Sequence, residues 1–281
     1  MEINVAGDTD RRAIVMASVS DRAELPVAMV TGTSRGIGAA TARLLAHRGY
    51  RLALMSRSGC QNLAAELGAW SFEGSLTEES DVKSFVEGIT AQYGRLDAVV
   101  ISTGRYASIL NNLEITTALS ICTAGFAFDP EFKLNLFAIT REAWHEALDL
   151  LVLGTVSTAN FATPHLLASG GGAIVAISVM EASEPRLRYL LGPVRSALHG
   201  FTRLYSDRYA ASGTRMNCVL PGLLENAVLN SDMQLPHTIP MGRTGKLEEI
   251  AETIAFLVCP ASSYVTGQLL LADGGLNRGI V

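Results

Sequence analysis

The chain has 281 residues, of which 48% are hydrophobic and 17% are charged. This composition excludes a disordered protein, and the length suits one large α/β domain or two small ones. The formal net charge of −5 excludes the overall basic character that is typical of nucleic-acid-binding proteins.

The cysteines and histidines are scattered, and neither type forms a metal-binding or redox motif. We therefore expect structural thiols in a reducing cytoplasm, at Cys60, Cys122, Cys218 and Cys259. The sequence contains no uninterrupted run of 18 apolar residues, so we expect no membrane-spanning helix. The N-terminus also lacks the basic and apolar regions of a signal peptide. The sequence thus predicts a cytoplasmic protein without a metal site.

In chain order, residues 1–25 come first; they are polar and aperiodic, so we expect a flexible N-terminal tail, with Met16 as an alternative start. From Pro26 onward, short apolar runs alternate with helical stretches. The predicted strands lie within residues 27–32, 51–56, 69–74, 96–102, 172–178, 215–222 and 267–275. The predicted helices cover residues 37–47, 62–67, 79–93, 144–167, 193–211 and 247–257. This alternation predicts a parallel sheet with helices on both faces, in one α/β domain over residues 26–281.

Residues 105–140 interrupt the alternation between a strand and the next long helix. The segment is apolar in patches and contains Gly125 and Pro130. A connection of this length within a compact domain is usually functional or mobile. We interpret it as an inserted lid over a substrate pocket; the alternatives are a surface excursion or an arm used in oligomer formation.

A glycine-rich turn, "TGTSRGIG" from Thr31 to Gly38, follows the first strand and opens the first helix. Such a turn lets the backbone approach a pyrophosphate and directs free helix N–H groups at the phosphates. A glycine turn without a ligand is the alternative, but the preceding strand and following helix favour dinucleotide binding. The predicted binding residues are Gly32, Thr33, Ser34, Arg35, Gly36, Ile37 and Gly38.

The end of the second strand indicates which nicotinamide cofactor binds. An acidic residue there would bind the ribose 2′-hydroxyl and repel a 2′-phosphate. The strand ends instead in Ser56, Arg57 and Ser58. Arg57 and Arg35 offer guanidinium groups suited to phosphate, so we expect NADP(H). The alternative is that these arginines are ordinary solvated side chains.

These motifs resemble the short-chain dehydrogenase/reductase family. Its TGxxxGxG spacing is met by Thr31, Gly32, Gly36 and Gly38, and the stretch from Met241 to Gly275 is similar to the family's C-terminal region. The resemblance covers about residues 26–275 apart from the insertion. It implies a Rossmann-type doubly wound parallel sheet with helices on both faces.

The resemblance also implies further cofactor contacts. "VLPGLLEN" is similar to the family's segment beside the nicotinamide, which would place Pro221, Gly222 and Leu224 near the carboxamide. The family's NNAG is altered to "ISTG", which contains Ser102 and Gly104. The aspartate that usually flanks the adenine is replaced by Ser75, followed by Leu76.

The family's catalytic asparagine, serine, tyrosine and lysine correspond to Leu151, Ser178, Leu191 and Arg195. Only the serine is retained. Ser178 can orient a carbonyl by hydrogen bonding, although it could also be an ordinary serine at a strand end. Arg195 keeps the positive charge and can bind the ribose, but arginine does not release its proton in a protein.

Reduction of a ketone leaves an alkoxide that must be protonated or otherwise stabilised. Three sources remain open: Tyr189, a lid residue such as Tyr106 or Asp129, or the substrate itself. Pro193 suits the first turn of a helix, so Tyr189 is expected just before that helix. A phenol next to the ketone could stabilise the oxyanion within one molecule, which is worth effective molarities of up to roughly 10⁵ M or more.

Leu151, Leu191 and Tyr106 are the residues that we expect to line a pocket for a flat aromatic substrate. The changed positions resemble those of atypical ketoreductases in aromatic polyketide antibiotic pathways. We therefore expect an NADPH-dependent ketoreductase that uses substrate assistance. The alternatives are an inactive NADP(H)-binding sensor or scaffold, and other chemistry on the same fold, such as dehydration or epimerisation.

Apolar residues cover much of the predicted helices 144–167 and 193–211. The family resemblance implies that these helices pair between subunits, which predicts a homodimer or homotetramer. Burial of both helices within a monomer is the alternative.

Overall fold

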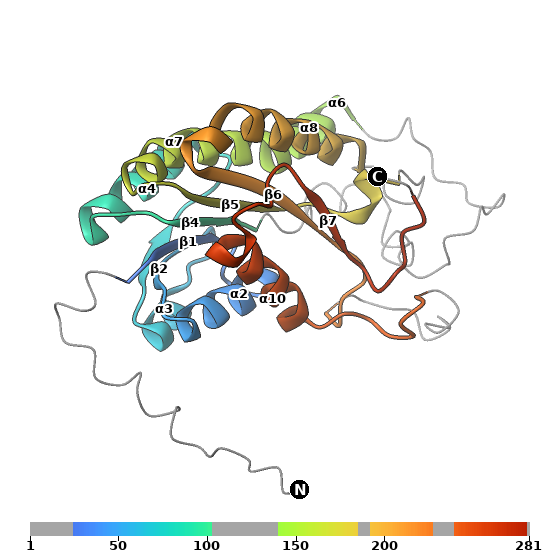
Figure 1. Ribbon diagram of the computed structural model, residues 1–281, viewed down its shortest axis with the longest axis horizontal. Coiled ribbons are helices and arrows are strands. Elements are labelled where there is room, and N and C mark those ends of the chain that lie inside the picture. The colour runs from blue at the N-terminus through green and yellow to red at the C-terminus, as the bar shows by residue number, and fades with distance from the viewer. Residues whose placement is uncertain (1–24, 103–139, 185–191, 227–238, 280–281) are drawn as a thin grey trace, which may run out of the picture.

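The computed structural model describes residues 25–102, 140–184, 192–226 and 239–279. Almost all of the predicted tail (1–25) and of the predicted lid (105–140) therefore lies outside the described residues. The described residues form one parallel sheet between two layers of helices (Figure 1). This arrangement confirms the predicted α/β fold.

The sheet has seven strands in the order β3-β2-β1-β4-β5-β6-β7, and every pair of neighbours is parallel. The strands are β1 (Val27–Thr31), β2 (Arg51–Ser56), β3 (Trp70–Glu73), β4 (Ala98–Ile101), β5 (Gly172–Ile177), β6 (Thr214–Pro221) and β7 (Leu269–Ala272). Strands β1 and β4 are buried along their whole length. Their continuous apolar runs are therefore what a strand covered on both faces requires.

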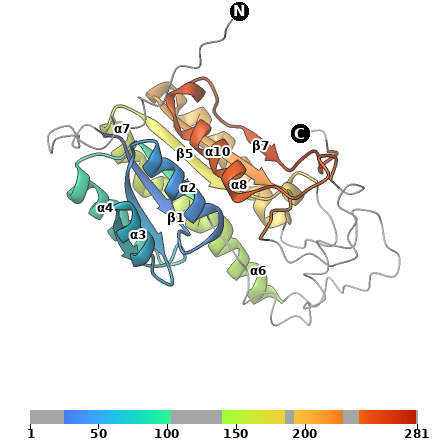
Figure 2. The same cartoon turned by 90° about the horizontal axis from the view of Figure 1, so that it is seen from below.

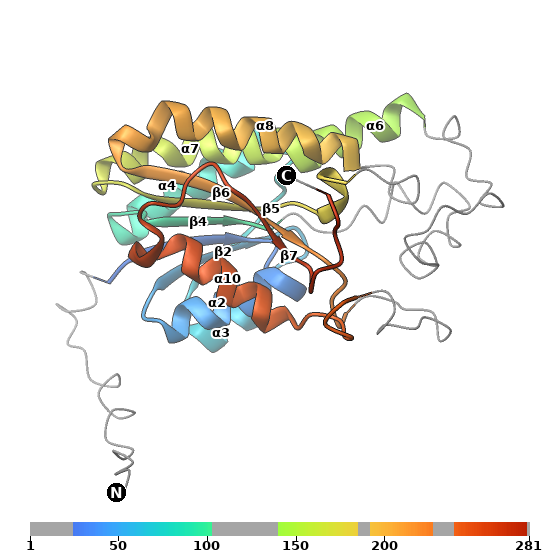
Figure 3. The same cartoon turned by 45° about the vertical axis from the view of Figure 1, so that its right-hand side comes forward.

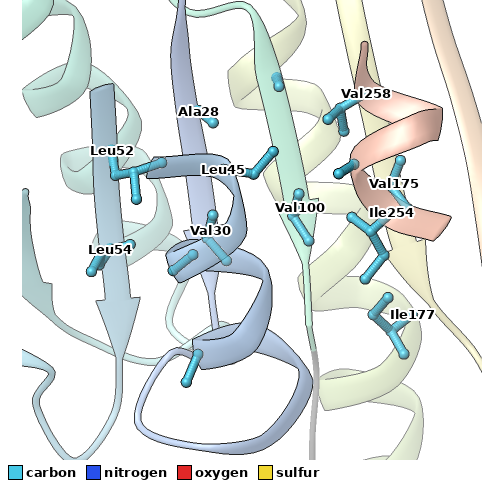
Figure 4. Packing of buried hydrophobic residues seen from close by; sticks show 14 of the residues in the cluster. Ala28, Val30, Leu45, Leu52, Leu54, Val100, Val175, Ile177, Ile254 and Val258 are labelled. Atoms are coloured by element: carbon cyan, nitrogen blue, oxygen red, sulfur yellow. The ribbon is translucent and has the colours of Figure 1, made fainter. Parts of the chain in front are cut away.

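Helices α2 (Gly36–His47), α3 (Gln61–Leu67) and α10 (Leu247–Val258) cover one face of the sheet (Figures 1 and 2). Between these helices and the sheet, Leu45 of α2 and Ile254 of α10 pack near the strand residues Val30, Val100 and Val175 (Figure 4). Burial of such side chains stabilises the fold by about 1.5–3 kcal/mol each.

The opposite face is covered by α4 (Glu79–Tyr93), α7 (Gly154–Ala168) and α8 (Gly192–Tyr209). The core on this side includes the fully buried residues Phe85, Ile89, Leu166 and Leu198. Since both faces are covered, the ligand-accessible part of the sheet is the edge formed by the ends of the strands.

The predicted helix over residues 144–167 is divided. It consists of α6 (Arg141–Leu148), a π-helical turn η5 (Asp149–Leu153) and α7, and α6 extends past the sheet (Figure 3). Apolar periodicity predicts the helix but carries no signal for the wider turn. A π-turn within an α-helix frequently marks a functional site.

This same helix, residues 141–168, is the one in the described parts of the chain that is long and apolar enough to cross a membrane. Of the most apolar 18-residue stretch of this helix, 50% is buried inside the protein. Ala159, Ala162 and Leu166 of α7 belong to the core between the sheet and the layer of α4, α7 and α8. Packing in this core explains the apolar composition without a membrane.

Candidate active site

The candidate site lies at the carboxyl ends of the central strands. The chain continues from β1 to β2 on one side and from β4 to β5 on the other, so β1 and β4 mark the topological switch point of the sheet. Ligands of open α/β sheets bind outside the strand ends at such a point. Thr31 and Ile101 are the last residues of these two strands.

The glycine turn leaves no room for side chains where it passes the neighbouring strand. A Cβ atom on Gly32 would lie 2.0 Å from the Ser102 carbonyl oxygen, and Gly32 has a φ of +66°. A Cβ on Gly38 would lie 2.4 Å from the Gly32 carbonyl oxygen. Ser102 N–H also donates to Thr31 Oγ1 at 3.1 Å. The turn is therefore held compactly against the end of β4, as close backbone approach to a pyrophosphate requires.

The first turn of α2 offers unpaired N–H groups to an anion. Arg35, the residue before the helix, is extended, and its side chain does not cap the helix. The first turn contains no acidic residue. An anion such as a diphosphate is favoured at this end by the helix dipole and the free donors. The turn thus fits the dinucleotide predicted from Gly32–Gly38.

The two arginines predicted to select NADP(H) are both exposed. Arg35 lies in the glycine turn, and Arg57 follows β2, next to Ser56. Ser56 Oγ donates to the Gly59 carbonyl oxygen at 3.0 Å, which fixes the bend after β2. The segment after β2 contains no carboxylate from Ser56 to Cys60. The charged side chain of this segment is therefore a guanidinium rather than a carboxylate.

The predicted adenine-side residues follow β3. Asp81 accepts a hydrogen bond from Ser75 N–H at 2.9 Å, and Ser75 Oγ is 2.8 Å from Thr77 Oγ1. The Leu76 carbonyl lies so close to α7 that a Cβ on Gly154 would be 2.8 Å from its oxygen. By accepting this hydrogen bond, Asp81 orders the backbone at Ser75, where the family usually has an aspartate. The sequence analysis did not predict this role for Asp81.

The segment after β6 carries the residues predicted beside the nicotinamide. Gly222 N–H donates to the Ala272 carbonyl at 3.1 Å, and a Cβ on Gly222 would lie 2.7 Å from the Asp273 Cα. Leu224 is buried and forms a β-bridge with Gly245. Pro221 and Gly222 thus end β6 in tight contact with the segment after β7.

Ser178 and Arg195 both lie at the end of β5. Both are buried, with exposed fractions of 1% and 2%. Arg195 Nη1 on α8 donates to the carbonyl oxygen of Ile177, the residue before Ser178. The positive charge of Arg195 is therefore held against the strand end that carries the serine.

His199 of α8 is a second residue that contacts the end of β5, and the sequence analysis did not predict it. Its Nε2 atom is 2.8 Å from Ser178 Oγ. Burial, followed by the charges of Arg195 and Arg203, lowers the pKa of His199 to about 4. The imidazole is consequently neutral near pH 7. The available signal was its position four residues after Arg195, one helical turn along the same face.

Leu151, at the position of the family's asparagine, lies in the π-helical turn and is fully buried. It packs in a small apolar cluster with Ala147 and Val152, against which Trp144 and Val194 lie. No polar side chain replaces the asparagine at this position. The other predicted site residues, Gly104, Tyr106, Asp129, Tyr189 and Leu191, lie outside the described residues.

The described cysteines are not paired with one another: Cys60 and Cys218 are buried and Cys259 is partly buried. Burial raises the pKa of the Cys218 thiol to about 11, so it is protonated and unreactive near pH 7. Within the described ranges, no group of three or more histidine, cysteine, aspartate or glutamate side chains is arranged to hold a metal ion.

Comparisons with known proteins agree with this geometry. The family model described as enoyl-(acyl carrier protein) reductase matches residues 32–120 and 115–277. A Streptomyces violaceoruber protein, described as ketoacyl reductase 2 of the granaticin polyketide synthase, is 35% identical over 92% of this chain and 98% of its own. The cis-4-hydroxycyclohexanecarboxylate dehydrogenase of Sinomonas cyclohexanicum is 32% identical over 89% of this chain and 95% of its own.

The solved structures agree as well. A short-chain type dehydrogenase/reductase from Mycobacterium ulcerans has a TM-score of 0.74 and 27% identity, covering 90% of this chain and 91% of that one. The sequence and structural matches both extend over nearly the whole chain.

Proposed function

The chain belongs to the short-chain dehydrogenase/reductase family, and we propose that it is an NADPH-dependent ketoreductase acting on an aromatic polyketide. The changed catalytic positions resemble those of the angucyclinone ketoreductase of simocyclinone biosynthesis. An angucyclinone-like intermediate is therefore the substrate class that we propose. The similarity to a protein described as a granaticin ketoacyl reductase supports a polyketide substrate.

The observation that carries this proposal is a compact glycine turn together with an ordered serine at the same edge of the sheet. Gly32 and Gly38 pack too closely against neighbouring backbone for any side chain. Glycine at these positions therefore keeps the turn tight enough for its backbone to approach a pyrophosphate. Ser178 follows β5, two strands from β1 in the sheet, and is fixed there by a hydrogen bond to His199. A protein that only bound the dinucleotide would not need an ordered hydroxyl at the position where the family orients a carbonyl.

The residues of the chain would bind and orient the two reactants. NADPH, when bound, supplies the hydride that reduces the ketone. The turn from Gly32 to Gly38 and the start of α2 would hold its diphosphate, and Arg57 with Arg35 its 2′-phosphate. Arg195 would hold the ribose, and Ser178 would donate a hydrogen bond to the carbonyl oxygen. Leu151, Leu191 and Tyr106 would exclude water from an aromatic ring.

The described chain offers no obvious side chain that could protonate the alkoxide formed by hydride transfer. Leu191 has no ionisable group, and Arg195 does not release a proton at physiological pH. Ser178 is too weak an acid to act alone. We propose that a phenol beside the ketone stabilises the developing oxyanion within the substrate. Tyr189 is the protein residue that would take this role if the substrate did not.

The test compares matched pairs of aromatic ketones, one member with a hydroxyl next to the carbonyl and one without. We expect NADPH oxidation with the hydroxylated member and little with the other. Equal rates for both members would overturn substrate assistance, and Tyr189→Phe would then show whether that phenol is the acid. NADPH binding without turnover of any ketone would favour the inactive sensor or scaffold.

We propose that the protein forms a homodimer or homotetramer through α7 and α8. Leu204 on α8 supports this proposal because this apolar residue is 68% exposed. A cytoplasmic location is proposed because reduced NADPH and unpaired thiols both belong to a reducing compartment.

A further inference from the structure

The end of β5 is held by two consecutive turns of α8. Arg195 donates to the Ile177 carbonyl, and His199 contacts the Ser178 hydroxyl one turn later. The backbone of Ser178 is fixed as well, since its N–H donates to the Val219 carbonyl at 2.8 Å. Neither the main chain nor the hydroxyl of Ser178 is therefore free to move independently of the sheet and α8.

The charge of His199 limits what it can do at this distance. Burial and two nearby arginines, Arg195 and Arg203, disfavour the imidazolium. A neutral imidazole carries one N–H, on either Nδ1 or Nε2. If Nδ1 carried it, Nε2 would accept the serine proton, and Ser178 could offer only lone pairs to a ligand. If Nε2 carries it, the imidazole donates to Ser178 Oγ and leaves the serine O–H for another acceptor.

A carbonyl oxygen can only accept a hydrogen bond, so it requires the second arrangement. Chains of hydrogen bonds also polarise one another, which makes the serine O–H a stronger donor when its oxygen accepts from an N–H. We propose that His199 is a positioning residue that donates from Nε2 to Ser178 and thereby directs the serine O–H at the substrate carbonyl oxygen. This inference rests on the proposed ketoreductase function.

Substitution of His199 separates positioning from packing and from proton transfer. His199→Gln keeps an amide N–H donor on a side chain of similar reach, whereas His199→Leu keeps bulk but loses the donor. We expect His199→Leu to lower kcat at least about tenfold, with little change in the KM for NADPH, because a misdirected group is costly in the reaction step. We expect His199→Gln to retain kcat within about threefold, since only the donor is needed.

A double variant provides the control. Since His199 acts through Ser178, adding His199→Leu to Ser178→Ala is expected to lower kcat no further than Ser178→Ala alone. Unchanged kcat in His199→Leu would overturn the inference. So would a His199→Gln enzyme as slow as His199→Leu, because the imidazole would then be needed for more than its N–H.

Nitrogen-15 NMR of the imidazole tests the same inference without turnover. The chain has 5 histidines, so the His199 signals can be assigned by their loss in His199→Gln. We expect a proton on Nε2, with signals that shift in Ser178→Ala. A proton on Nδ1 alone would overturn the inference even in an active enzyme. If no ketone is reduced but Nε2 carries the proton, the proposed function fails, while the arrangement of His199 and Ser178 stands.

Discussion

The guanidinium of Arg195 donates a hydrogen bond to the main-chain carbonyl of Ile177, immediately before Ser178. A buried arginine is thus directed at the end of β5. Arg195→Met should lower the free energy of unfolding by about 1–3 kcal/mol, because it leaves a buried carbonyl without this donor. Urea denaturation measures this loss. Arg195→Lys keeps a donor and should lose less; equal losses would contradict the assigned role of the hydrogen bond.

Cofactor preference should depend on Arg57. Arg57→Ala is expected to weaken NADPH binding about tenfold or more and to leave NADH binding nearly unchanged, because a hydrogen bond to a charged group contributes about 1.5–3 kcal/mol. Fluorescence titration with both cofactors measures the two affinities. Arg43→Ala is the matched control, since Arg43 is an exposed arginine of α2 already paired with Glu66 at 2.8 Å. Equal loss of NADPH and NADH affinity in Arg57→Ala would refute a role in binding the 2′-phosphate.

The glycine turn should tolerate no side chain at Gly38. Gly38→Ala would place a Cβ 2.4 Å from the Gly32 carbonyl oxygen. We expect a loss of about 1–3 kcal/mol in unfolding free energy and weaker NADPH binding. Gly200 is a suitable control because it lies within α8 and nothing lies within 4 Å of its added Cβ. Gly200→Ala should raise stability by about 0.5–1 kcal/mol; a normal NADPH affinity in Gly38→Ala would argue against the turn as the diphosphate site.

Stability should depend on His199 between about pH 6.5 and pH 4. The pKa of His199 is lowered from 6.5 to about 4 in the folded protein, by burial and then by Arg195 and Arg203. Between these values the unfolded chain binds a proton that the folded chain does not, so acidification favours unfolding. Thermal melting across this range should show a steeper loss of Tm in the wild type than in His199→Gln. Parallel loss in both proteins would contradict the buried neutral imidazole.

The apolar surface of α8 should form a subunit contact. Leu204 on this helix is 68% exposed, and Leu153 in the π-turn is 47% exposed. Light scattering should give the mass of a dimer or tetramer, and Leu204→Lys should reduce that mass, because a charge in an apolar interface is costly. Met241→Lys is a control at a residue of similar exposure, 64%, outside these helices. A monomeric wild type would exclude the predicted assembly.

The fold could be predicted from the sequence because its central strands are buried on both faces and therefore consist of continuous apolar runs. Runs such as "VAMVT" and "RLALMS" have no polar interruption until the strand ends, and they coincide with β1 and β2. Helix bounds were also close: the expected helix 79–93 is α4, and α2 begins one residue before the predicted start. Local periodicity and a turn at each end contain the information that defines these elements.

The candidate site was readable only in part. The glycine turn and the serine follow strands, so their place at the carboxyl edge could be inferred from the order of elements. The π-turn at Leu151 could not, because apolar spacing does not reveal a local change of helical pitch. Asp81 and His199 were missed because each contacts a residue outside its own helix. The spacing of His199 from Arg195 places both residues on one face of α8, but it does not show that this face meets Ser178.

By itself, the sequence determined the alternation of strands and helices and the position of the glycine turn after the first strand. These features depend on residue type and on neighbours within a few positions. The tertiary structure decided the strand order, the position of Arg195 against Ile177 and the pairing of His199 with Ser178. The two side-chain contacts join residues 18 and 21 positions apart. They form because packing of α8 on the sheet brings buried polar groups together, where each must find a hydrogen-bond partner.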